Sequence, residues 1–292
     1  MSKADIYQQI TDRIVEKLEQ GIIPWKKPFT SIKKQYPKNF VSKKMYNGAN
    51  FFLTLLEGRN TPYWLTFKQA KELGGNVKKG ERGMPIVYFQ FIEKVNDEGK
   101  KYSFPMVKHS TVFNLEQVEG IENLFEQEMK DLIVTNTFNN IESCESLINR
   151  LSEADIIPEV RHSLMENAFY YPSQDYINMP LRDRFSEEQF YYSTLFHEIA
   201  HSTGHLSRLA RKGITEHYKK DSPGYAREEL VAELSASFIC AETGIVKDTE
   251  ENTTAYIQLW LQALKNDNKI IYDAMRDSFK VLEHLQILKE AA

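Results

Sequence analysis

The chain has 292 residues, of which 41% are hydrophobic and 27% are charged, a composition typical of a soluble folded protein long enough for two domains. No stretch approaches the roughly 20 apolar residues needed to cross a bilayer. Two cysteines, Cys144 and Cys240, are too few for a disulfide framework or a thiolate zinc site. The composition therefore excludes a membrane-spanning protein and a disulfide-stapled protein, and it favours the reducing cytoplasm.

The net charge of −4 conceals two halves of opposite sign. Residues 1–110 carry 20 Lys and Arg against 10 Asp and Glu, whereas the remaining 182 residues carry 17 against 31. A basic half beside an acidic half favours two domains with different partners. The basic half is therefore the candidate for binding a polyanion.

In chain order, the first predicted element is a helix over residues 4–20, whose apolar residues recur at helical spacing and which ends at Gly21. Its charges distinguish it from a signal peptide. Residues 25–50 lack periodicity and are expected to be mostly loop. Helices are predicted over 48–59 and 63–75, the second capped by Thr66. A strand over 85–95, a turn at 97–99 and a returning strand through 101–118 predict a β-hairpin.

The sequence becomes acidic after about residue 120. We place an N-terminal domain over residues 1–125, a linker over 126–140 and a C-terminal domain over 141–292. The second domain is predicted to contain a β-hairpin over 168–180 and helices over 141–154, 186–204, 225–244, 254–266 and 270–288. Ser186 and Gln189 have the spacing of a capping box for the second of these helices. The predicted fold class is α+β, with an α+β N-terminal domain and a mainly helical C-terminal domain that has a small β-sheet.

The segment LFHEIAHSTGHL, residues 195–206, carries the pattern H-E-x-x-H at His197, Glu198 and His201. Residues four apart share a helix face, so both imidazoles can point at one ion and leave a coordination position open. A divalent ion lowers the pKa of water and polarises a scissile carbonyl, while Glu198 takes the proton of the water and passes it to the leaving amine. The spacing predicts a metallopeptidase centre with zinc as the default metal and manganese as an alternative.

Two histidines do not complete a metal site. A third histidine at the metzincin position is excluded, because that position holds Ser207. His205 follows Gly204, where the helix is expected to end, and we interpret it as a basic helix-terminal residue rather than a ligand.

A glutamate on a second helix is the remaining solution, and EELVAEL supplies three. Glu229 and Glu233 share a face with small residues, which lets this helix approach the motif helix. We assign Glu229 as the third ligand, with Glu228 as the alternative, and Glu233 as the acceptor that orients a histidine. The pattern is that of a gluzincin-like site.

A hydrogen-bond donor for the transition state is still required. Tyr225 and His217 are the candidates near the start of the second helix, and Tyr225 is the one we include in the catalytic set. The hairpin over 168–180 precedes the motif helix and offers an edge strand along which a peptide can lie.

Lysines alternate with aromatic residues in the basic half, where Tyr36, Phe40 and Tyr46 are among the aromatics. Lysines that contact phosphates and aromatic faces that stack on bases are typical of proteins that bind single-stranded nucleic acid. The residues predicted to contact DNA are Trp25, Lys26, Lys27, Lys33, Lys34, Lys43, Lys44, Lys78, Lys79 and Arg82.

Several long motifs resemble one family across nearly the whole chain. ITDRIVEKLEQGIIPWKKPF, YWLTFKQAKELGGNVKKGERGMPIVYF and STVFNLEQVEGI resemble the N-terminal domain of ArdC-type antirestriction proteins. INMPLRDRFSEEQFYYSTLFHEIAHSTGHLSRLAR and YAREELVAELSASFICAETGI resemble the zincin-type metallopeptidase domain of that family. The resemblance implies a cytoplasmic protein of a plasmid or other mobile element that binds single-stranded DNA, holds a metal through His197, His201 and a glutamate of EELVAE, and protects incoming DNA from host restriction.

These observations leave three functional hypotheses. The first is a DNA-associated zinc metallopeptidase that cuts a host protein such as a restriction subunit. The second is a non-catalytic protein that coats DNA and uses the metal structurally, and the third is a general cytosolic peptidase with an incidental basic domain. The DNA partner is single-stranded DNA, with double-stranded DNA as an alternative.

Overall fold

The computed structural model describes residues 3–21, 23–24, 36–59, 61–95, 101–124, 140–216, 222–245 and 253–288. The predicted linker over 126–140, apart from residue 140, and the predicted turn at 97–99 lie outside these ranges. The same is true of His217 and of five predicted DNA contacts: Trp25, Lys26, Lys27, Lys33 and Lys34.

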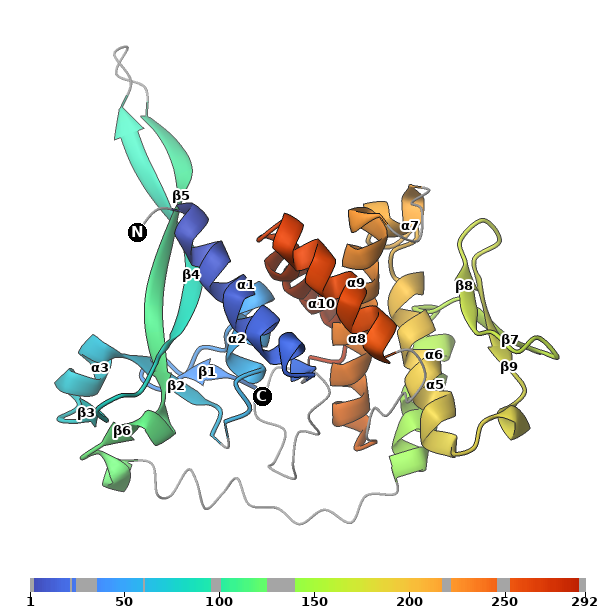
Figure 1. Ribbon diagram of the computed structural model, residues 1–292, viewed down its shortest axis with the longest axis horizontal. Coiled ribbons are helices and arrows are strands. Elements are labelled where there is room, and N and C mark those ends of the chain that lie inside the picture. Colours follow the sequence, from blue (N-terminus) through green and yellow to red (C-terminus); the bar gives the residue numbers. More distant parts are fainter. Residues whose placement is uncertain are drawn as a thin grey trace.

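The N-terminal half is built on a sheet with the strand order β1-β2-β5-β4. Strands β4 and β5 pair in antiparallel register from Met84 with Val112 to Val95 with Lys101, and this long hairpin projects from the rest of the molecule (Figure 1). A second, small sheet pairs β3 with β6. The elements of this half are α1 (Lys3–Glu19), β1 (Lys38–Asn39), α2 (Gly48–Leu55), β2 (Tyr63–Thr66), α3 (Phe67–Glu72), β3 (Asn76–Val77), β4 (Met84–Val95), β5 (Lys101–Asn114) and β6 (Val118–Glu119).

The helix predicted over 63–75 is wrong at its start, because residues 63–66 form strand β2. Trp64 and Leu65 are 2% and 0% exposed and lie between β1 and β5 in the sheet, where aromatic and apolar side chains pack well. The predicted cap is nevertheless confirmed: Thr66 and Gln69 form a capping box that starts α3.

The C-terminal half is mainly helical and carries a sheet with the strand order β7-β9-β8. The hairpin predicted over 168–180 is confirmed as β8 and β9, in which Tyr170 pairs with Ile177. Strand β7, which pairs in parallel with β9, was not predicted. The elements of this half are α5 (Asn140–Glu153), β7 (Glu159–Ser163), β8 (Phe169–Tyr171), β9 (Tyr176–Pro180), α6 (Glu188–Ser202), α7 (Lys212–Thr215), α8 (Pro223–Thr243), α9 (Thr253–Asn266) and α10 (Ile270–His284).

The capping box predicted at Ser186 and Gln189 is wrong. Helix α6 starts two residues later, and its N-cap residue Glu187 makes no side-chain cap hydrogen bond. Phe185 packs edge-on against Tyr191 at 5.5 Å between ring centroids. This aromatic contact fixes the entry of the chain into α6 in place of a capping side chain.

The layers follow one another along the long axis of the molecule (Figure 1). Helix α2 packs on β4, α10 packs on α2, α8 packs on α10, and α6 lies between α8 and the strands β8 and β9. Phe51 of α2 contacts Phe238 of α8 and Phe279 of α10, each at 5.4 Å between ring centroids. One apolar core therefore joins both halves, and the α+β class is confirmed.

None of the helices in the described ranges is both long and apolar enough to span a membrane.

Candidate metal centre

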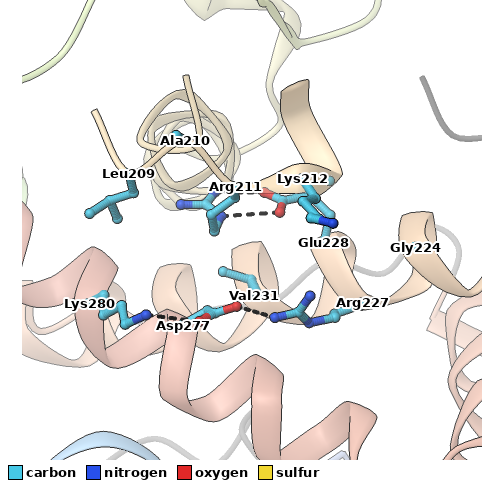
Figure 2. Close-up of a pocket in the computed structure, with 11 residues that line it drawn as sticks. Leu209, Ala210, Arg211, Lys212, Gly224, Arg227, Glu228, Val231, Asp277 and Lys280 are labelled. Carbon is cyan, nitrogen blue, oxygen red and sulfur yellow. Dashed lines mark hydrogen bonds and ion pairs between the residues drawn. The ribbon is translucent and has the colours of Figure 1, made fainter. Parts of the chain in front are cut away.

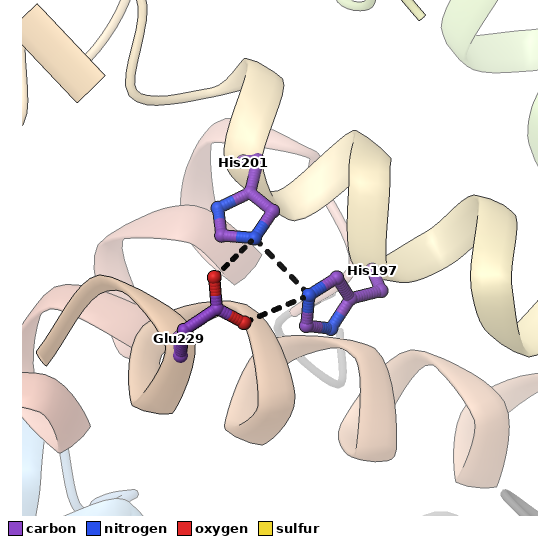
Figure 3. Close-up of side chains that lie close together, drawn as sticks. All are labelled: His197, His201 and Glu229. Carbon is purple, nitrogen blue, oxygen red and sulfur yellow. Dashed lines mark hydrogen bonds and ion pairs between the residues drawn. The ribbon is translucent and has the colours of Figure 1, made fainter. Parts of the chain in front are cut away.

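Helices α6 and α8 pack closely because the residues between them are small. Ala200 of α6 and Ala232 and Ala236 of α8 are each 0% exposed. This contact brings the side chains of His197 and His201, one turn apart on α6, against Glu229 of α8 (Figure 3). One ligand atom from each of the three residues lies within 4.8 Å of the others.

The three distances suit a single metal ion. The two Nε2 atoms of the histidines are 3.1 Å apart. Glu229 places Oε2 at 3.5 Å from Nε2 of His197 and Oε1 at 3.7 Å from Nε2 of His201. Bonds of 2.0–2.1 Å to a tetrahedral ion put neighbouring ligand atoms about 3.3 Å apart. The side chains therefore fit a bound ion with little rearrangement.

The opposite ring nitrogens of both histidines face carboxylates. Nδ1 of His201 lies 3.3 Å from Oε1 of Glu228, and Nδ1 of His197 lies 3.7 Å from Oε2 of Glu233. A carboxylate near Nδ1 favours the tautomer with the proton on that nitrogen. The Nε2 atoms, 3.1 Å apart, are then the ring nitrogens turned towards the point where a metal ion would be held.

Glu229 is held in its ionised form. Burial raises the pKa of this carboxyl group, but the hydrogen bond with His197, the charges of His201 and His197 and the hydroxyl of Tyr225 outweigh burial and lower the pKa to about 2. Tyr225 lies in the first turn of α8, and its hydroxyl is hydrogen-bonded to Glu229. Glu229 is thus available at neutral pH as an anionic ligand, and the hydroxyl of Tyr225 lies directly beside it.

Glu198 is buried between α6 and strand β8. Its Oε2 accepts a hydrogen bond of 2.8 Å from the backbone N–H of Tyr170. This N–H points away from β9, so the outer edge of β8 faces Glu198. The predicted edge strand and the predicted general base are therefore neighbours.

Sequence reasoning missed Arg211, a buried arginine behind the histidines. Arg211 donates to both carboxylate oxygens of Glu228, at 2.6 Å and 3.1 Å, and to the carbonyl of Ala200 at 2.8 Å and Thr203 Oγ1 at 2.6 Å. Burial raises the pKa of Glu228, but the charge of Arg211 and the hydrogen bonds from His201 and Arg211 lower it on balance. No spacing rule pointed to Arg211, because it follows the motif helix in an irregular loop.

A second missed group connects α6 to β8. Arg208 donates to the carbonyl of Ser202 at 2.8 Å, to the hydroxyl of Tyr170 at 3.2 Å and to Asp175, which lies in the turn between β8 and β9. The hydroxyl of Tyr170 donates to Asp175 at 2.7 Å. These bonds fix the strand whose backbone holds Glu198.

His205 lies outside the ligand group. Its Nδ1 is 2.7 Å from Oγ of Ser207. The helix was expected to end at Gly204, but α6 ends two residues earlier, at Ser202. A Cβ at Gly204 would lie 2.5 Å from Cγ1 of Ile214, so glycine is needed here for close packing.

The described DNA-contact residues lie at the surface of the basic half. Their side chains are exposed, and they comprise Lys43, Lys44, Lys78, Lys79 and Arg82. The aromatics expected among them are different: Phe40 is buried, and Tyr36 packs on Phe51 and Phe238. Two exposed aromatics were missed instead, namely Phe67 and Tyr88, with exposures of 52% and 43%.

Comparison with known protein families divides the chain in the same way as its charge. Residues 4–113 match the family described as the N-terminal domain of anti-restriction factor ArdC. Residues 147–277 match the family described as zincin-like metallopeptidase.

Several relatives match most of the chain. A DNA primase TraC of Escherichia coli is 32% identical over 302 residues, which is 97% of this chain and 20% of the primase. A second TraC primase of that species is 32% identical and is covered over 27% of its length. The chain thus spans about a fifth to a quarter of these primases. Protein y4eC of Sinorhizobium fredii is 29% identical, with 92% of this chain and 88% of y4eC covered.

Two crystal structures of the antirestriction protein ArdC from plasmid R388 share the fold. The metal-free structure has a TM-score of 0.72 at 34% identity, with 97% of both chains covered. The Mn(II)-bound structure has a TM-score of 0.70 at 33% identity and the same coverage. With this identity along both chains and a family match in each half, the chain belongs to the ArdC family of antirestriction proteins.

Proposed function

We propose that the chain is a DNA-binding metallopeptidase that protects incoming DNA from restriction in the host cytoplasm. The observation that carries the proposal is the convergence of His197, His201 and Glu229 on one point, with Glu198 next to His197 on α6. These three residues would hold a divalent metal, and the Mn(II)-bound relative supports a divalent ion. Zinc fits the same donor set of two imidazoles and one carboxylate.

The bound ion would supply Lewis acidity, which activates water and polarises the scissile carbonyl. Glu198 serves as the general base. The N–H of Tyr170 occupies its Oε2, so Oε1 is the atom that accepts a proton from water and passes it to the leaving amine. Tyr225 lies beside Glu229 in the first turn of α8, and its hydroxyl would turn from Glu229 to donate to the developing charge on the carbonyl oxygen.

The outer edge of β8 is the proposed place for the substrate. A peptide that adds to this edge as a further strand would run past Glu198, because the N–H of Tyr170 on that edge already reaches the carboxylate. Arg208 and Asp175 keep the strand in place. The substrate we propose is an extended segment of a host protein, such as a restriction subunit.

The basic half is proposed to bind single-stranded DNA. The exposed lysines named above would contact phosphates, and the exposed rings of Phe67 and Tyr88 offer faces on which bases can stack. The similarity to two proteins named DNA primase supports DNA as the partner. DNA binding would carry the peptidase to proteins that act on incoming DNA.

The substitution Glu198→Gln tests the catalytic part of the proposal. It removes the proton acceptor but keeps the size of the side chain and its hydrogen bond with Tyr170. We expect metal content and the melting temperature to stay unchanged, while protection of a transferred plasmid in a restricting host falls to the level without the protein. Glu188→Gln, an exposed glutamate in the first turn of the same helix, is the matched control.

If Glu198→Gln protected DNA as well as the unmodified chain, peptide hydrolysis would not be the protective activity. The chain would then act by coating DNA, with a structural metal.

A further inference from the structure

A cavity of about 260 Å³ lies behind the metal centre, between the loop that leads into α7, the first half of α8 and α10 (Figure 2). Arg211 and Glu228 form the wall shared with the metal centre. Cationic side chains from three different elements face the remaining space: Lys212 from α7, Arg227 from α8 and Lys280 from α10. The cavity is thus a basic site within the acidic half of the chain.

The two carboxylates of the cavity offset only part of this positive charge. Glu228 is fully engaged by Arg211. Asp277 is shared, since it pairs with Arg227 and, at 3.5 Å, with Lys280 (Figure 2). It also pairs with Arg276 at 3.4 Å. Lys212 contacts only the exposed Glu216, at 3.6 Å, among the ion pairs of the described residues.

One donor in the cavity wall also lacks an acceptor. Nε of Arg227 is buried, and within the part of the chain that the structure describes it meets no hydrogen-bond partner. A buried donor without an acceptor destabilises the folded chain. Arg227 is therefore only partly satisfied by its ion pair with Asp277.

The loop that forms the wall is held in a demanding conformation. Ala210 adopts a left-handed backbone with φ of 47°, which is unfavourable for a residue with a Cβ. A Cβ at Gly213 would lie 2.6 Å from both Cβ and Oε2 of Glu228, so the loop presses directly on this carboxylate. The cavity is therefore a defined feature of the packing, built on the pair of Arg211 and Glu228.

We propose that this cavity binds a phosphate monoester carried on a small polar group, such as a nucleoside monophosphate or the 5′-phosphate of a DNA strand. A phosphate offers three oxygens and nearly two negative charges. The four cationic side chains that line the cavity exceed its two carboxylates by two charges, which a phosphate would compensate. A carboxylate carries only one negative charge and would compensate less of this excess. The volume leaves room for a sugar beside the phosphate, and the walls are mainly polar, with Leu209, Ala210 and Val231 as the apolar residues. This site is separate from peptide hydrolysis and does not rest on the proposed function.

Isothermal titration calorimetry on the full chain, dialysed against a chelator so that phosphate cannot bind a metal, tests the proposal. We expect dAMP to bind at least tenfold more tightly than deoxyadenosine. Lys280→Gln and Arg227→Gln should each weaken dAMP binding at least tenfold. Lys68→Gln, an exposed lysine on α3 that lies outside the cavity, is the matched control and should leave the affinity unchanged.

A second arm separates the two sources of the phosphate. A thymidine trinucleotide with a 5′-phosphate is compared with its 5′-hydroxyl form, in the unmodified chain and in Lys280→Gln. A gain from the phosphate that disappears in the variant identifies a strand end as the ligand, whereas binding of dAMP without such a gain identifies a free nucleotide. The proposal is overturned if neither dAMP nor the 5′-phosphate binds better than its phosphate-free counterpart, or if Lys280→Gln binds as the unmodified chain does. The side chain of Lys280 is 55% exposed, so its replacement leaves the fold intact, and an unchanged melting temperature would show this.

Discussion

Three carboxylates of α8 face two histidines of α6, and each occupies a different position. Glu229 faces the Nε2 atoms of both histidines, whereas Glu228 and Glu233 each approach one Nδ1 atom. Residues 229 and 233 lie one turn apart, so they follow the two turns of α6. Glu228 is rotated by about 100° from Glu229 and reaches His201 from the side of Arg211. The same residue type thus serves as proposed ligand and as support.

The lowered pKa of Glu229 predicts a stability that depends on acid pH. Its folded pKa is about 2 against an ordinary value of 4.5, so the ionised carboxylate stabilises the folded chain above pH 4.5 and this contribution is lost as the pH falls from 4.5 towards 2. Between those values one group contributes a slope of about 1.4 kcal/mol per pH unit. Glu229→Gln should remove this slope.

Urea unfolding of the metal-free protein between pH 5.5 and 3.5 measures the effect. The unmodified chain should lose more free energy of unfolding than Glu229→Gln over this interval. Parallel curves for the two proteins would show that Glu229 does not have a lowered pKa. Glu188→Gln again provides the control, because Glu188 is exposed.

At the scale of the elements, the end of α6 is fixed by side chains that follow it. Arg211 donates to the carbonyl of Ala200 and Arg208 donates to the carbonyl of Ser202, so both satisfy groups that the helix end leaves unpaired. Arg211 also donates hydrogen bonds to Glu228 of α8, and Arg208 donates hydrogen bonds to Asp175 beside β8. These two arginines hold α6 against both neighbours, which keeps His201 and Glu198 in place.

A double-mutant cycle on the buried ion pair tests this role. Arg211→Met leaves the carboxylate of Glu228 buried without its partner, and we expect a loss of about 3–5 kcal/mol in the free energy of unfolding. Arg211→Met combined with Glu228→Gln should recover part of this loss, because no unpaired charge remains. Urea unfolding of the metal-free variants measures both. Equal losses in the single and double variants would contradict the coupling.

At the scale of the molecule, the basic half and the zincin-like half share one core. Tyr7 of α1 packs on Tyr272 of α10 at 5.0 Å between ring centroids, and Thr11 donates to the carbonyl of Asn268 at 2.8 Å. The boundary near residue 125 remains a prediction about the chain, but the helices on its two sides are packed as one body. A fragment of residues 1–125 would expose the apolar faces of α1 and α2, so DNA binding is best measured in the intact protein.

The intact protein should bind single-stranded DNA with an affinity that falls steeply as salt increases, because lysines that contact phosphates release counterions. Fluorescence anisotropy with a labelled oligonucleotide between 50 and 200 mM salt should give a linear decrease of log K with log salt. Phe67→Ala should weaken binding by about 1–3 kcal/mol if a base stacks on this exposed ring. A response that is flat with salt would exclude the proposed phosphate contacts.

The sequence by itself determined the features that depend on local spacing. Residues near one another in sequence placed His197, Glu198 and His201 on one helix and predicted the cap at Thr66. They also predicted the hairpin of β8 and β9 and the division of the chain by charge. Helical periodicity places residues four apart on one face in any helix. These predictions needed no knowledge of how the elements pack.

Only the tertiary structure decided which side chains meet across elements. The rotation of α8 against α6 decides that Glu229 faces both Nε2 atoms and that Glu228 approaches His201 from the side. It also shapes the cavity between α7, α8 and α10. Strand β7 and the buried Arg211 were missed for the same reason, since their partners are distant in sequence. Burial of apolar surface fixes such rotations over the whole core, so they cannot be derived from the spacing of any one segment.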